Sequence, residues 1–249
     1  MPNDTQGPFT VGSERAGYVS GYMTLVPQSW RAMLGGPALT GQSTIPIITR
    51  TSFGPAVSVF DPDDIGVKDP VPATALLYYP QAHPLMNAWD VQSEYFNGTT
   101  GIRGVVFPEG TRSVLFFGRQ GTGPFCYGLG TADRALVGTT YRDGVTKWCS
   151  EPDAPPEGSS KGNHAYPYRY QVWAYDALDL AKVKAGELQP WEVRPYAMWP
   201  LTLPQAPSSN SFASTYINGA AYDPARRRIF LTQDRGENPL VHVFTLSLP

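Results

Sequence analysis

The chain has 249 residues, which is enough for one large domain, and 41% of them are hydrophobic, as in a globular protein. The 19 basic and 21 acidic residues give a net charge of −2, which favours neither nucleic acid nor an anionic membrane surface as a partner. No apolar run approaches the roughly 20 residues of a membrane span, so we expect neither a membrane span nor a nucleic-acid partner.

The first predicted elements are strands that belong to an internal repeat. Its first copy, at about residues 18–66, opens with Gly36 and an apolar stretch and continues with strands at 45–50 and 57–61. Another strand is expected at 22–26, before Gly36, and one helical turn is expected at 29–34.

The second copy, at about residues 74–180, repeats this order. It has strands at 75–79, 104–107, 114–119 and 172–176, with an insertion at 120–168 before the last strand. A long loop in one copy of a repeat is a usual place for an individual function. The sequon at Asn97 is typical of an exposed segment.

The insertion contains both cysteines of the chain, Cys126 and Cys149. We predict a disulfide between them, because only three histidines and no other cysteine are available for a structural zinc site. Two free thiols are the alternative. A disulfide implies an oxidising compartment, so we expect an extracellular or periplasmic protein whose signal peptide preceded Met1.

A helix follows the second copy and the third copy ends the sequence. The helix is expected over 176–186, with Asp176 or Asp179 as its N-cap and Gly186 at its end. The third copy, at about 196–249, has strands at 196–203, 219–222, 229–234 and 241–245.

The spacing of the copies supports the repeat. The polar residues that end the middle strands are Arg50, Arg119 and Asp234, and the first two are 69 residues apart. Arg119 and Asp234 are 115 residues apart, which becomes about 69 once an insertion of about 46 residues is removed.

These elements predict an all-β, β-propeller-like single domain of three four-stranded sheets over 1–249. Propellers close with about four to eight blades, so three interpretations stay open: part of a larger propeller, two chains completing one ring, or less regular packing. We favour a partial or dimer-completed propeller, and hence a homo-oligomer, because sheet edges would otherwise be exposed. The repeat resembles secreted bacterial β-propeller-like proteins of uncharacterised function, most clearly in Tyr222, Asp223 and Pro224 of the third copy.

Two groups of residues are candidates for binding. Arg50, Arg119 and Asp234 are expected near one rim of the repeat, and Gln120 and Arg235 follow directly; the alternative is that they only cap strands and pair with one another. The end of the insertion gathers aromatic and basic side chains that suit a glycan, or that simply cover the sheet. This second group consists of His164, Tyr166, Tyr168 and Arg169.

The leading hypothesis is a secreted module that binds a carbohydrate or another surface polymer. A glycoside hydrolase or lyase with acidic residues near the axis is one alternative, and a structural assembly subunit is the other. No phosphate loop, nucleophile elbow or metalloprotease motif is present, so no cofactor or metal is expected and no catalytic residue is selected.

Overall fold

The computed structural model describes most of the chain. The residues described are 7, 9–12, 21–42, 52–80, 95–122, 126–127, 129, 131, 133–149, 163–165, 167–204, 217–233 and 238–247. Within them, three antiparallel sheets of four, four and three strands form an all-β structure with few helices. The predicted fold class is confirmed to that extent.

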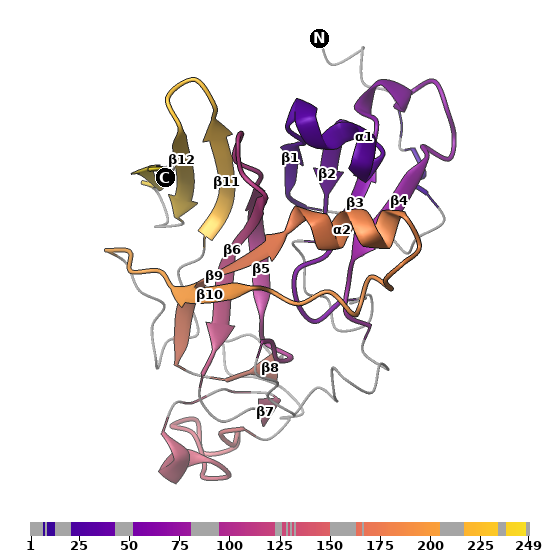
Figure 1. The fold of residues 1–249 in the computed structure, drawn as a ribbon. Coiled ribbons are helices and arrows are strands. Elements are labelled where there is room, and N and C mark those ends of the chain that lie inside the picture. Colours follow the sequence, from indigo (N-terminus) through magenta and orange to yellow (C-terminus); the bar gives the residue numbers. More distant parts are fainter. Residues whose placement is uncertain are drawn as a thin grey trace.

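Each sheet is a meander, in which consecutive strands of the sheet pair with one another (Figure 1). Sheet 1 consists of β1 (Met23–Leu25), β2 (Ala38–Thr40), β3 (Val57–Phe60) and β4 (Ala73–Leu77). Sheet 2 consists of β5 (Gly101–Val106), β6 (Ser113–Gly121), β9 (Tyr168–Asp176) and β10 (Ala197–Pro200). Sheet 3 consists of β11 (Ile217–Asp223), β12 (Arg228–Gln233) and β13 (Leu240–Thr245).

The strand order corrects the alignment of the first repeat. Strands β2 and β3 pair directly, with Leu39 opposite Val59, so the predicted strand at 45–50 does not lie between them. In sheets 2 and 3 the corresponding middle strands, β6 and β12, do lie between their neighbours. The strand predicted at 196–203 for the third copy is β10, which instead pairs with β9 as the fourth strand of sheet 2. Residues 45–50 themselves lie outside the described residues. The apolar alternation that identified the strands carries no information on which strands pair, and this is why the alignment failed here.

Two helices flank the sheets. The short helix α1 (Arg31–Leu34) lies where one helical turn was expected. Helix α2 (Ala177–Lys184) confirms the predicted helix and selects its cap, because the side chain of Asp176 accepts a hydrogen bond from the backbone N–H of Leu178 at 2.9 Å. Gly186 follows with a φ of +77°, a conformation that suits glycine after a helix. No described helix has the length and apolar character that crossing a bilayer requires.

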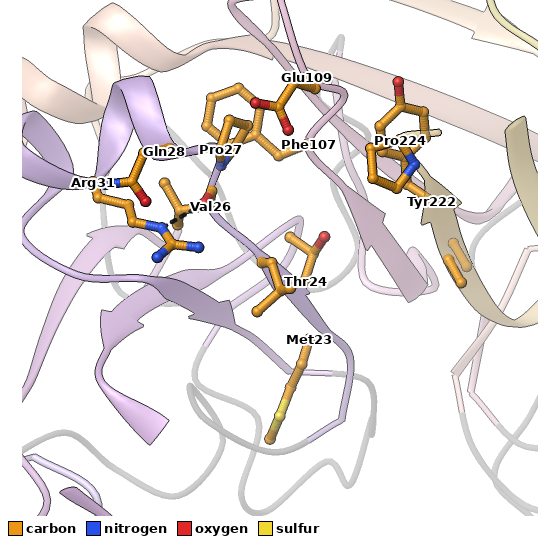
Figure 2. A pocket seen from close by; sticks show the side chains of 13 residues that line it. Met23, Thr24, Val26, Pro27, Gln28, Arg31, Phe107, Glu109, Tyr222 and Pro224 are labelled. Carbon is orange, nitrogen blue, oxygen red and sulfur yellow. Dashed lines mark hydrogen bonds between the residues drawn. The ribbon is translucent and has the colours of Figure 1, made fainter. Parts of the chain in front are cut away.

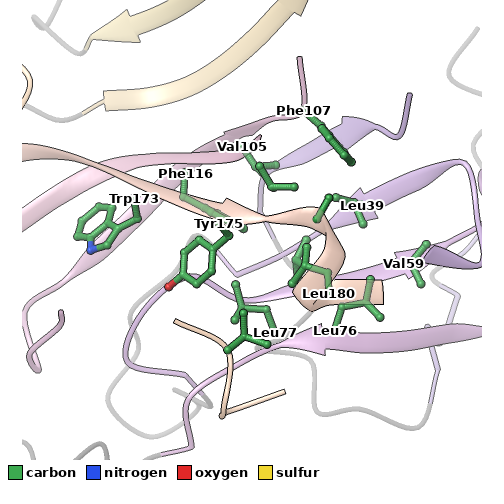
Figure 3. Packing of buried hydrophobic residues seen from close by; sticks show 14 of the residues in the cluster. Leu39, Val59, Leu76, Leu77, Val105, Phe107, Phe116, Trp173, Tyr175 and Leu180 are labelled. Carbon is green, nitrogen blue, oxygen red and sulfur yellow. The ribbon is translucent and has the colours of Figure 1, made fainter. Parts of the chain in front are cut away.

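Sheet 2 lies between the other two sheets, and each of its faces carries a separate core. One face packs Phe116, Trp173 and Tyr175 against sheet 1 and α2, as Figure 3 shows. The other face packs Phe117 and Val172 against sheet 3. The register explains this division, because neighbouring residues of a strand point to opposite faces.

The insertion forms a separate lobe at the end of sheet 2, the lower end in Figure 1. A two-stranded ladder of β7 (Cys126–Tyr127) and β8 (Asn163–His164) joins its two ends. Within the lobe, the backbone N–H of Cys149 donates to the carbonyl of Leu129 at 2.7 Å. Both cysteines therefore take part in the backbone pairing of the described part of the insertion.

Candidate functional site

The first strands of the three sheets meet at one place. Strand β5 lies against both β1 and β11, and each of these three strands is at the edge of its own sheet. At the closest point, a Cβ added to Gly104 would lie 2.5 Å from the Cβ of Ala220 and 2.7 Å from its backbone nitrogen. Only glycine permits this approach of β5 to β11.

A cavity of about 350 Å³ lies at this junction, and we call it the first-strand groove. Figure 2 shows side chains of β1 on one side of it and those of β11 and the turn after it on the other, with Phe107 and Glu109 between them. The groove is lined by Met23, Thr24, Leu25, Val26, Pro27, Gln28, Arg31, Phe107, Glu109, Ala220, Ala221, Tyr222 and Pro224.

The groove combines apolar surface with a few polar groups. Met23 is 57% exposed and Leu25 is 68% exposed, so its apolar rim is open to solvent. Arg31 is held at the groove by a hydrogen bond from its Nε to the carbonyl of Val26 at 3.0 Å. Glu109 is exposed, and it is the only carboxylate among the described residues that line the groove.

Both burial and nearby charges shift the pKa of the Tyr222 hydroxyl. Burial raises the pKa of its hydroxyl, against the lowering influence of Arg227, and the Glu109 carboxylate adds to the rise. At neutral pH the hydroxyl is therefore a neutral group that can both donate and accept a hydrogen bond. Together with Gln28, it gives the groove neutral polar partners beside one cation and one anion.

A second, smaller cavity continues along the same junction. It has a volume of about 170 Å³ and shares Met23 and Ala220 with the first-strand groove. Gly21, Tyr22, Arg103, Asn218 and Gly219 complete its lining. The two cavities together follow the line along which β1, β5 and β11 meet, which gives the junction the elongated shape that suits an extended ligand.

Four of the predicted binding residues lie together, but not at this groove. Arg119 and Gln120 end β6, opposite Tyr170 and Arg169 of β9. The guanidinium of Arg119 lies 4.1 Å from the centre of the Tyr168 ring, a cation–π contact. Gln120 is buried and Arg169 is exposed. A ligand role for this end of sheet 2 stays a prediction.

The structure also brings the third repeat close to this end of sheet 2. Gln233 donates from its amide to the hydroxyl of Tyr170 at 2.8 Å, and the amide oxygen of Gln233 lies 2.8 Å from Nε2 of His242. Tyr170 is in turn the register partner of Arg119. This contact joins β12 to β9. The expected convergence of Arg50, Arg119 and Asp234 stays a prediction, because Arg50 and Asp234 lie outside the described residues.

The side chains of the remaining predicted binding residues lie outside the described part of the structure. Arg50, Tyr166, Asp234 and Arg235 lie outside the described residues, and only the backbone of His164 is described, in β8 opposite Cys126. Among the described residues, no three His, Cys, Asp or Glu side chains gather in a way that would hold a metal ion.

The sequon at Asn97 is buried, which corrects the expectation of an exposed segment. Asn97 is 3% exposed, and its amide nitrogen donates to the carbonyl of Gly121 at 2.8 Å. Its side-chain oxygen accepts hydrogen bonds from both the backbone N–H and the hydroxyl of Thr99. In the folded state this asparagine closes a turn and is not accessible to a glycosylating enzyme.

Sequence reasoning missed the groove because it followed the polar residues at strand ends. The strands that meet are the first ones of each sheet, and their sequences carry few polar groups. One signal was available, since two copies open with a glycine in the first strand, Gly104 and Gly219. A glycine inside a strand often marks the close approach of another backbone.

In comparisons with known proteins, no family model, no curated protein and no solved structure matches this chain. The evidence on function is therefore the geometry of the groove.

Proposed function

We propose that the protein is a binding module that holds a glycan or another surface polymer in the first-strand groove. The observation that carries the proposal is the composition of this groove, in which the apolar surfaces of Met23, Leu25 and Tyr222 lie beside the polar groups of Gln28, Arg31 and Glu109. Sugars present apolar ring faces and hydroxyl groups together, so they need both kinds of partner.

The same groove favours binding over hydrolysis. Glycoside hydrolysis usually needs two carboxyl groups about 5 to 9 Å apart. Glu109 is the only carboxylate among the described lining residues, and Arg31 is the only cation at the larger cavity. We therefore do not place a hydrolytic centre there.

We further propose that the three sheets are blades of an open propeller. Two observations support this: the sheets are antiparallel meanders stacked face to face, and their first strands meet along one line. This is the relation of neighbouring blades around a propeller axis. The groove then occupies the position of the axial channel, where propellers commonly bind ligands.

An extracytoplasmic location and a Cys126–Cys149 disulfide belong to this proposal. The described residues include no free cysteine, and the ladder of β7 and β8 ties the two ends of the lobe together. Mass spectrometry of the unreduced protein tests the disulfide. A cross-linked peptide that contains both cysteines is expected, and alkylation of both thiols without prior reduction would exclude it.

A glycan array probed with the full chain tests the proposed function. We expect binding to a restricted class of glycans, with a loss of about tenfold or more in affinity for Tyr222→Ala and for Glu109→Gln, since each removes a partner at the centre of the groove. Tyr196→Ala is the matched control, because Tyr196 is 57% exposed, lies directly before β10 and does not line the groove.

Arg119→Ala separates the groove from the other candidate surface. If this variant loses binding while Tyr222→Ala and Glu109→Gln retain it, the ligand is held at the end of β6 and β9 and the groove assignment is wrong. No binding to any glycan or cell-wall polymer by the folded protein would reject the proposed function itself.

A further inference from the structure

Among the described residues, sheet 3 has one strand fewer than its two companions. In sheets 1 and 2 a fourth strand pairs with the outer side of the third, as β4 does with β3 and β10 does with β9. In sheet 3 no described strand pairs with the outer side of β13. Half of the backbone N–H and C=O groups of an edge strand point away from its sheet, where they can pair with another strand.

Strand β13 has none of the features that usually protect an edge. Its six residues pair with β12 without a bulge, and its sequence, Leu240–Thr245, contains no proline, lysine or acidic residue. Natural sheets use such residues and bulges to prevent unwanted strand pairing. A regular, uncharged edge is therefore a favourable site for strand addition.

The other outer edges are protected. Helix α2 lies against β4, where the ammonium of Lys184 donates to the hydroxyl of Thr74 at 2.9 Å. Strand β10 is only four residues long and ends with Pro200, which has no N–H to donate to a ladder. Strand β13 is therefore the outer edge that lacks such protection.

The outer face of sheet 3 is also apolar next to this edge. Val241 is 58% exposed and Val243 is 53% exposed. The register places Val243 in one row with Phe230 and Ala221, and both flanking strands contribute to that row. An added strand with apolar side chains at alternate positions would extend this row and cover the valines.

We infer that β13 pairs in antiparallel fashion with β13 of a second copy of this chain. The edge is complementary to itself, because Val241, Val243 and Thr245 are β-branched, uncharged and on the same face. A twofold axis perpendicular to the sheet keeps this face common to both copies, so β-branched side chains lie opposite one another across the new ladder. No like charges on the two strands oppose the pairing.

The association is expected to depend on concentration. The ladder of a six-residue strand buries less surface than the roughly 1,600 Å² of a standard stable interface, so the dimer should dissociate on dilution. This inference is independent of the proposed ligand, because β13 contributes no residue to the first-strand groove.

Sedimentation velocity of the full chain over a hundredfold range of concentration tests the inference. The unmodified protein is expected to shift from monomer to dimer, and Val243→Lys should weaken the dimer at least tenfold by placing two like charges at the edge. Val145→Lys is the matched control, since Val145 is 82% exposed in the insertion and belongs to none of the three sheets. It should leave the dimer unchanged.

Trp199→Lys tests whether the dimer forms through β13 and not through another edge strand. Trp199 is 40% exposed on β10, which is the outer strand of sheet 2. This variant should dimerise as the unmodified protein does. The inference is overturned if the protein is monomeric at every concentration, or if Val243→Lys dimerises normally while remaining folded by circular dichroism. It is also overturned if Trp199→Lys, and not Val243→Lys, abolishes the dimer.

Discussion

Gly104 has no side chain, and this allows sheets 2 and 3 to approach closely. The backbone of β11 occupies the space where a side chain would begin, so the contact that forms the floor of the junction depends on this residue. Gly219, which opens the third copy in the same way, has much more room, with Oγ1 of Thr232 at 3.3 Å as the one atom near an added Cβ. Two glycines at equivalent places in the sequence therefore have different roles.

Gly104→Ala should destabilise the protein by about 1–3 kcal/mol, the usual cost of overpacking. The added methyl group would force β5 and β11 apart, because the three nearest atoms that it meets all belong to Ala220. Gly219→Ala is the control and should cost less, since a small movement of Thr232 relieves its contact. Urea denaturation of both variants measures the difference. Equal costs for the two would show that the close approach at Gly104 is not a constraint.

Three buried tyrosines determine how the fold responds to alkaline pH. Burial raises the pKa of the hydroxyl groups of Tyr22, Tyr79 and Tyr175 above the ordinary value of 10. The hydroxyl of Tyr79 also donates to the carbonyl of Val193 at 2.6 Å and lies 2.9 Å from that of Tyr175. These groups are stable in the core only while they keep their protons.

Stability should therefore fall as the pH rises above about 10. The unfolded chain releases these protons near its ordinary tyrosine pKa, whereas the folded chain retains them, so each tyrosine lowers the free energy of unfolding by up to about 1.4 kcal/mol per pH unit above that point. Below pH 10 their contribution is fully present. Denaturant unfolding between pH 9 and 11 measures the slope, and Tyr175→Phe should reduce it. An unchanged slope in this variant would contradict the assignment.

At the scale of elements, the helix α2 shows how much a local pattern can predict. Its cap, its length and its terminating glycine follow from neighbouring residues, and the structure has all three. Strands were predicted for the same reason, because alternating apolar residues bounded by turns need no distant information. Every described strand of the three sheets except β2 overlaps a predicted one.

Pairing and convergence were harder, because they depend on residues far apart in the chain. Nothing near residues 45–50 indicates that β2 bypasses them to pair with β3. In the same way, the groove is formed by β1, β5 and β11, which are about 80 and 115 residues apart in the sequence. The predicted site instead followed the polar residues at the ends of the middle strands. The repeat predicted that three sheets exist, but not which of their strands meet at the groove.

The cap of α2 gives a test at this scale. Asp176→Ala should destabilise the protein by about 1 kcal/mol, because the backbone N–H of Leu178 loses its acceptor. Asp176→Asn retains an oxygen at this position and should recover most of that loss, although it removes the ion pair with Arg112. Thermal unfolding of the two variants compares them. If Asn is as destabilising as Ala, the ion pair and not the cap is what matters.

At the scale of the whole molecule, sheet 2 serves two cores that do not share residues. The core that faces sheet 1 and α2 is the larger one and contains the fully buried Trp173 and Tyr175. The core that faces sheet 3 is smaller, and sheet 3 has neither a fourth described strand nor a helix against it. Stability within one chain varies with the number of such buried contacts.

Sheet 3 should therefore open before the rest of the molecule. Hydrogen exchange followed by mass spectrometry is expected to show faster exchange in β11, β12 and β13 than in β6 and β9, because fewer buried side chains hold sheet 3 in place. Leu231→Ala, at a fully buried site in the smaller core, should widen this difference. Leu76→Ala, equally buried in the larger core, should instead accelerate exchange in sheet 1.

The outcome also bears on the groove, since β11 forms one of its walls. If sheet 3 opens independently, Leu231→Ala should weaken ligand binding more than Leu76→Ala does at a similar loss of global stability. Should both variants accelerate exchange equally in all three sheets, the molecule unfolds as a single cooperative unit. The wall of the groove would then be as rigid as the rest of the fold, and its shape would be fixed before a ligand binds.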